Sequence, residues 1–115
     1  TREPGLWPRP ELTAPRLAEL ASLDDATFRQ VFAGSPIKRT GRDRFVRNVL
    51  IAIGNSGLAD LAASAERLSA DESPLVRAAA IWALGRLNAE DAARLAAERR
   101  SLEPDPDVAA EWALV

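Results

Sequence analysis

The chain has 115 residues, 17 acidic and 15 basic side chains, and a formal net charge of −2, which fits one domain with a slight acidic excess. It contains no Cys and no His, which excludes disulfides and cysteine-ligated clusters within these residues and removes the commonest general base and metal ligand. The abundance of Ala and Leu, with few aromatic residues and almost no strand-type alternation, predicts an all-α fold.

Four of the eight prolines lie in residues 1–15, which predicts a Pro-rich linker strap ahead of a domain at 16–115. Leu6 and Trp7 are large enough to anchor this strap on the domain. Because the chain opens on Thr1 rather than Met, we expect a piece of a longer protein. No apolar run approaches the roughly 20 residues that a membrane span needs, so we expect a cytoplasmic protein with no membrane partner.

Two short helices are predicted next, the first around Leu17 and Leu20 and the second over residues 25–32. Ser22 and Asp24 are candidate N-caps of the second helix. Its apolar residues recur at i, i+3 and i+4 and are expected in the core: Phe28, Val31 and Phe32.

A strongly basic segment follows. Residues 29–47 contain one acid, Asp43, and six cations: Arg29, Lys38, Arg39, Arg42, Arg44 and Arg47. The segment therefore carries +5 and the rest of the chain −7, since the whole chain is −2. Such a charge asymmetry indicates a surface that meets an anion, although a solvated loop or ion pairs to the acidic remainder are alternatives.

The basic segment runs into a predicted helix whose apolar stripe is Phe45, Val46, Val49, Leu50 and Ile53. Gly54-Asn55 is predicted to end it, because both residues tolerate the left-handed conformation. Arg47 and Asn48 lie on another face, where they could contact RNA, a cofactor edge in an upstream domain, or the neighbouring helix. An Arg–carboxylate bridge and an Asn that caps a loop carbonyl are equally good explanations.

The C-terminal half predicts four more helices: Leu58–Leu68, Pro74–Leu87, Ala89–Leu102 and one that starts at Asp105-Pro106. Ser73 and Asn88 are expected N-caps, and the acids at the helix starts are explained by capping rather than by a metal site. The helix over 74–87 has two apolar stripes, so we expect it to be sandwiched between neighbours.

Three segments repeat at about thirty residues, as in an α-solenoid. Ala52-Ile53-Gly54 recurs as Ala83-Leu84-Gly85, and Ser73–Gly85 resembles a short HEAT-like repeat. The first copy departs from this pattern through its longer basic loop, and the third lacks the repeat's Arg. In HEAT-like repeats that Arg bridges to an acid of an adjacent repeat, which implies Asp105 or Asp107 as the partner of Arg77. The predicted fold is a right-handed array of six or seven short helices.

The pattern from Phe28 to Asn55 resembles the C-terminal region of the epoxyqueuosine reductases: Phe28-Arg29, Phe32, Gly34 to Arg39, Arg42, Phe45, Arg47 to Val49 and Ala52 to Asn55. That family makes the last step of queuosine synthesis on the wobble base of certain tRNAs. Its cobalamin and two [4Fe–4S] clusters are held by upstream catalytic and ferredoxin-like domains. The resemblance therefore implies a fragment with no catalytic residue or cofactor of its own, in a parent oxidoreductase.

The resemblance also implies a partner, the tRNA anticodon stem-loop. The residues assigned to tRNA phosphates are Lys38, Arg39, Arg42, Arg44 and Arg47, and those assigned to tRNA or interdomain contacts are Arg29, Asn48 and Asn55. Base stacking is not expected, because the three Phe lie at core spacings and Trp82 and Trp112 are predicted inter-helix contacts. The alternative is a HEAT-type protein–protein interaction module whose basic loop docks an acidic partner.

Overall fold

The computed structural model describes residues 13–115, and every regular element in that range is helical. The predicted all-α, HEAT-like class is confirmed. The α-helices are α1 (Ala14–Ala21), α2 (Asp25–Val31), α3 (Arg42–Ser56), α4 (Ala62–Leu68), α5 (Pro74–Leu87), α6 (Ala89–Arg99) and α7 (Pro106–Ala113). Three short 3-10 helices lie between them: η3 (Pro36–Thr40), η4 (Ala59–Leu61) and η5 (Arg100–Leu102). None of the helices in this part of the chain is long and apolar enough to cross a membrane.

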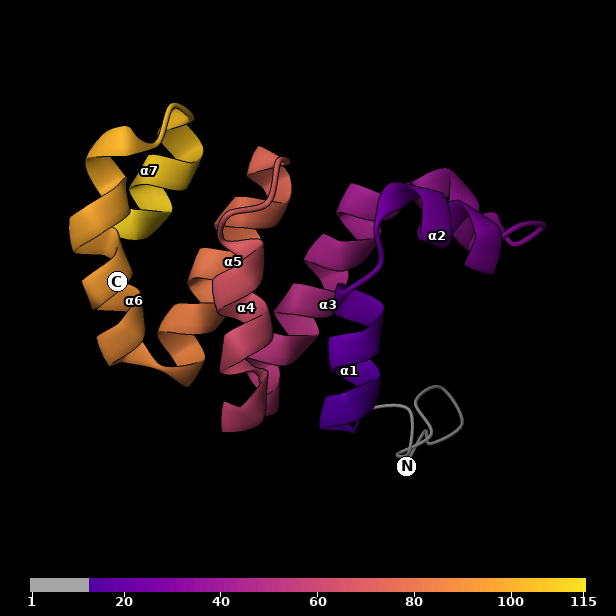
Figure 1. The fold of residues 1–115 in the computed structure, drawn as a ribbon, viewed down its shortest axis with the longest axis horizontal. Coiled ribbons are helices and arrows are strands. Elements are labelled where there is room, and N and C mark those ends of the chain that lie inside the picture. Colours follow the sequence, from indigo (N-terminus) through magenta and orange to yellow (C-terminus); the bar gives the residue numbers. More distant parts are fainter. Residues whose placement is uncertain (1–12) are drawn as a thin grey trace.

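The helices follow one another along an elongated body of 41 × 29 × 19 Å (Figure 1). α1 and α2 lie at one end, α6 and α7 at the other, and α5 lies between α3 and the last pair. α5 packs against α3, α4, α6 and α7, which makes it the centre of the array. The predicted sandwiching of this helix is confirmed.

The central position of α5 agrees with the burial of its side chains. Val76, Ala80 and Leu84 are completely buried, and Ile81 and Ala83 on the neighbouring positions are buried as well. Burial of apolar side chains on two sides of one helix is the main stabilising contribution in such a stack. The second predicted stripe is shallower, because Ala79 and Trp82 are half-buried and Leu75 is 40% exposed.

Most helices begin where the capping residues predict. The side chain of Asp24 accepts a hydrogen bond from the Thr27 N–H, and Ser73 and Asn88 cap α5 and α6 in the same way. The linker predicted for residues 1–15 lies mainly outside the described residues, and its last two residues already belong to α1. The helix predicted from Leu58 is divided into η4 and α4.

The predicted end of α3 at Gly54-Asn55 is wrong. The helix continues to Ser56, and the left-handed residue is Gly57, with φ of 69°. Gly54 is instead required inside the helix, because a Cβ at this position would overlap the ring of Trp82 on α5. A glycine in a helix interior is here a sign of close helix packing rather than of a helix end.

The aromatic residues of α2 and α3 form a small core of their own. Phe28, Phe32 and Phe45 stack in tilted pairs with ring centroids 5.0 to 5.4 Å apart. Phe28 is buried, whereas the other two rings are half-buried. The prediction that Val31 is a core residue is wrong, because 57% of it is exposed. Trp112 is buried, as expected of an inter-helix contact.

Candidate nucleic-acid interface

The basic segment folds into η3 and the first half of α3. Glycines with positive φ lie on either side of η3, Gly34 at 78° and Gly41 at 84°. The Ser35 hydroxyl accepts a hydrogen bond from the Ile37 N–H at 3.2 Å and so starts η3. This short helix replaces the irregular loop that the sequence predicts, and it presents Lys38 and Arg39 to solvent.

α3 divides its residues between core and solvent. Val46, Val49 and Leu50 are buried against the rest of the array, which turns Arg44 and Arg47 outward, and both are exposed. The predicted apolar stripe is thus confirmed, with Phe45 half-buried at its edge. Asn48 and Asn55 are also exposed on α3.

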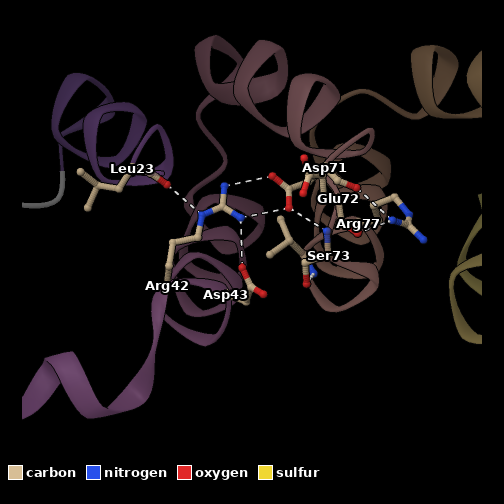
Figure 2. Close-up of polar contacts among 8 residues, drawn as sticks. Leu23, Arg42, Asp43, Asp71, Glu72, Ser73 and Arg77 are labelled. Carbon is tan, nitrogen blue, oxygen red and sulfur yellow. Dashed lines mark hydrogen bonds and ion pairs between the residues drawn. The ribbon is translucent and has the colours of Figure 1, made fainter. Parts of the chain in front are cut away.

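Arg42 behaves differently from the other cations, as Figure 2 shows. Its guanidinium donates from Nε to the Leu23 carbonyl at 2.8 Å and makes two parallel bonds to the Asp71 carboxylate, at 3.0 and 2.9 Å. A further bond reaches Asp43 at 3.1 Å. Only 14% of the Arg42 side chain is exposed. The bidentate pair joins the start of α3 to the loop between α4 and α5, so Arg42 has a structural role.

The ionisation of Asp71 follows from this geometry. Burial by itself would raise the pKa of Asp71, but the bonds from Arg42 and from the Ser73 N–H favour the carboxylate and bring that pKa below its ordinary value. The same bonds to Asp71 raise the pKa of Arg42. Both groups are therefore charged in the folded protein near neutral pH.

Arg77 makes an equivalent link one repeat further along. It forms a bidentate pair with Glu103, at 3.0 and 2.9 Å. It also donates to the backbone carbonyls of residues 71–72, as Figure 2 shows. The structural role predicted for Arg77 is confirmed, but the predicted partners, Asp105 and Asp107, are wrong. Glu103 lies before the α7 cap and holds it, since its carboxylate accepts from the Asp105 N–H.

The remaining cations of the basic segment form only one ion pair in the described residues. Arg29 pairs with Asp25 at 3.1 Å within α2, where both side chains are more than 60% exposed, so this pair contributes little. Within residues 13–115, four of the predicted tRNA contacts are exposed and make no ion pair: Lys38, Arg39, Arg44 and Arg47. Of the alternatives for Arg47 and Asn48, the carboxylate bridge and the carbonyl cap are not formed in the described part of the chain.

A shallow hollow of about 550 Å³ lies beside η3, lined by Gly34, Ser35, Pro36, Lys38 and Arg39. A larger groove of about 860 Å³ opens between α2, α3 and α5, with Arg42 and Asp71 among its lining residues. No group of three or more His, Cys, Asp or Glu that could hold a metal ion is found between Thr13 and Val115.

One exposed arginine that the sequence analysis did not single out lies on α5. Arg86 makes no ion pair within the described range, and its guanidinium lies over the Trp82 ring. The signal that could have found it is the repeat itself, because Arg86 follows Gly85 as Asn55 follows Gly54.

Residues 39–115 match the family model described as HEAT repeats, and the chain belongs to that family. Among curated proteins it is 38% identical over 87 residues to the epoxyqueuosine reductase of Xanthomonas campestris, 36% over 86 residues to that of Salmonella typhimurium and 34% over 86 residues to that of Escherichia coli. These matches cover 75% of this chain and 24, 22 and 23% of the relatives, so the chain spans about a quarter of their length. The resemblance to a HEAT-like part of epoxyqueuosine reductase is thereby confirmed. No solved structure matches the chain significantly.

Proposed function

We propose that this chain is the tRNA-contacting HEAT-repeat domain of an epoxyqueuosine reductase, and that it holds the anticodon stem-loop by its phosphates. The observation that carries the proposal is the set of four exposed cations without an ion pair in residues 13–115, on a chain that is acidic overall: Lys38, Arg39, Arg44 and Arg47. Arg and Lys that neutralise phosphates bind nucleic acid without regard to its sequence.

These cations lie on two adjoining elements, η3 and α3. Lys38 and Arg39 extend from η3 beside the shallow hollow, and Arg44 and Arg47 follow within the first two turns of α3. A surface of this kind positions a structured RNA rather than reads its bases.

Arg42 stabilises the domain rather than binding tRNA. Four of its five N–H groups are used by Leu23, Asp43 and Asp71, so one donor remains for a phosphate. The redox chemistry of queuosine synthesis, with cobalamin and two [4Fe–4S] clusters, is assigned in this proposal to upstream domains of the parent protein. The contribution of this domain is to orient the tRNA toward them.

The test is a titration of the intact protein against a fluorescent tRNA anticodon stem-loop at 50 and 200 mM salt. Four phosphate contacts predict an affinity about 100-fold lower at the higher salt. Arg39→Glu/Arg47→Glu should weaken binding at least tenfold, because two contacts become repulsive. The matched control is Arg67→Glu/Arg100→Glu, which makes the same charge change at two exposed arginines of α4 and η5 that form no ion pair in residues 13–115, and it should leave binding close to wild type.

The outcomes separate the two candidate functions. Weaker binding in the η3–α3 variant alone supports the tRNA surface. If the intact protein does not bind the stem-loop, or if both double variants bind as wild type does, the cations do not contact tRNA. The basic segment would then serve an acidic protein partner.

A further inference from the structure

The outer side of α5 carries an arginine that is held in one orientation. The guanidinium carbon of Arg86 lies 5.3 Å from the centroid of the Trp82 ring, which is a cation–π distance. Its Nε donates to the Gly54 carbonyl of α3 at 3.0 Å. Held at two points, the side chain loses little further rotamer freedom when it binds a ligand.

The two terminal nitrogens of Arg86 are available to a ligand. Within residues 13–115 they make no hydrogen bond to protein and no ion pair, and the residue is exposed. A guanidinium that presents its outer edge in this way can form the bidentate bond to phosphate that Arg favours. In Arg42 both terminal nitrogens are bonded to the Asp71 carboxylate, and in Arg77 one is bonded to Glu103 and the other to two backbone carbonyls.

The repeat places Arg86 on the stripe of α5 that corresponds to the stripe of α3 containing Arg44. If Gly54 is aligned with Gly85, the outward positions of α3 match those of α5 one for one: Arg44 with Leu75, Asn48 with Ala79, Ile51 with Trp82, and Asn55 with Arg86. These positions lie at helical spacing and are exposed or half-buried on both helices. α3 and α5 pack against each other (Figure 1), and the Trp82 ring lies against Gly54.

The distance between Arg47 and Arg86 fits an extended ligand. Arg47 precedes Gly54 by seven residues, which is about 10 Å along the helix axis. Arg86 is bonded to the Gly54 carbonyl, so the two arginines lie at opposite ends of a strip. The side chains between them are Asn48, Ile51, Asn55 and Trp82, none of them acidic.

We propose that Arg86, positioned by Trp82 and the Gly54 carbonyl, contacts an RNA phosphate and extends the tRNA surface from α3 onto α5. This inference rests on the proposed function and adds a residue to its site. The competing explanation is structural: Arg86 would serve only to close the C-terminal end of α3 through the Gly54 carbonyl.

A single substitution separates these roles. In Arg86→Gln the amide nitrogen occupies the position of the arginine Nε, so the bond to the Gly54 carbonyl can remain while the charge and the terminal nitrogens are lost. Arg100→Gln makes the same charge change on η5, where the residue is also exposed. Both variants are made in the intact protein and titrated against the fluorescent anticodon stem-loop from 50 to 300 mM salt.

Loss of one phosphate contact predicts that the slope of log K against log salt decreases in magnitude by about 0.7 to 0.9 in Arg86→Gln. The affinity at 100 mM salt should fall about fivefold, and Arg100→Gln should match wild type in both quantities. Thermal unfolding of Arg100→Gln should coincide with wild type, and that of Arg86→Gln should shift only slightly, because it loses the cation–π contact with Trp82 but keeps the bond to the Gly54 carbonyl. Equal slopes and affinities for Arg86→Gln and Arg100→Gln would overturn the inference.

The failures of the two proposals are distinguishable. If Arg39→Glu/Arg47→Glu abolishes binding while Arg86→Gln behaves as its control does, the tRNA surface ends at α3 and only the further inference is wrong. If wild type does not bind the stem-loop at all, both proposals are wrong.

Discussion

Replacement of Arg42 by Met should destabilise the domain although the residue lies in the basic segment. The substitution keeps an apolar stem of similar length and removes the guanidinium. It leaves the Asp71 carboxylate, 14% exposed, without its bidentate partner, and the Leu23 carbonyl without its donor. The cost arises mainly from this uncompensated charge rather than from the lost attraction.

The magnitude follows from the degree of burial. Removal of one member of a fully buried pair costs about 3–5 kcal/mol of unfolding free energy, and an exposed pair about 0–1 kcal/mol. The Arg42–Asp71 pair lies between these limits but near the buried one, so we expect a loss of about 2–3 kcal/mol. Because the pKa of Asp71 is lowered in the folded state, its contribution is present above its ordinary pKa of 3.8 and is lost as the pH falls through the lowered value. The penalty of Arg42→Met should therefore shrink below about pH 4.

The assay is urea unfolding of the chain, followed by circular dichroism at pH 7 and pH 3. Arg44→Met is the matched control, because it removes an exposed cation two residues away and should change the unfolding free energy by less than about 0.5 kcal/mol. Adding Asp71→Leu to Arg42→Met should recover part of the loss, since no charge is then left unpaired. If Arg42→Met is as mild as Arg44→Met at pH 7, the structural role assigned to Arg42 is wrong.

Two further predictions concern packing. Gly54→Ala should cost about 1–3 kcal/mol of unfolding free energy, because its Cβ overlaps the Trp82 ring, whereas Gly85→Ala meets only the terminal Val115 side chain and should be close to neutral. Urea midpoints of the two variants check this, and equal midpoints would contradict it. Phe28→Ala should cost about 3–5 kcal/mol, because the ring is buried at the centre of the aromatic cluster of α2 and α3. A loss below about 1 kcal/mol in the same assay would show that the cluster does not stabilise this end of the array.

The helices could be predicted from the sequence because local signals specify them. Ser73 and Asn88 are capping residues, and the cap and apolar stripes of α5 predict both of its ends correctly. The end of α3 could not be found locally. Gly54 has the usual chemistry of a helix end, and only the ring of Trp82, 28 positions later in the sequence, explains why it lies inside the helix.

In the candidate site, too, some features follow from the local sequence and others only from tertiary contacts. Six cations in one segment are visible in the sequence, but which of them are neutralised depends on tertiary neighbours. Arg42 meets Asp71, 29 residues away, just as Arg77 meets Glu103, 26 residues away. The rule applied to Arg77, that an arginine in the first turn of a repeat bridges to the loop of the next, would have identified Arg42 as structural too.

The number of cations that remain unpaired limits how strongly salt can act on RNA binding. The sequence offers six cations to phosphates, whereas the structure leaves four without an ion pair in η3 and α3 and adds Arg86 on α5. Five contacts predict a slope of log K against log salt of about −3.5 to −4.5. The combination of Arg39→Glu/Arg47→Glu with Arg86→Gln should bring it to about −2 or shallower. A wild-type slope steeper than about −4.5 would mean that a sixth cation contacts RNA, and a shallower slope in Arg42→Met would identify that cation as Arg42.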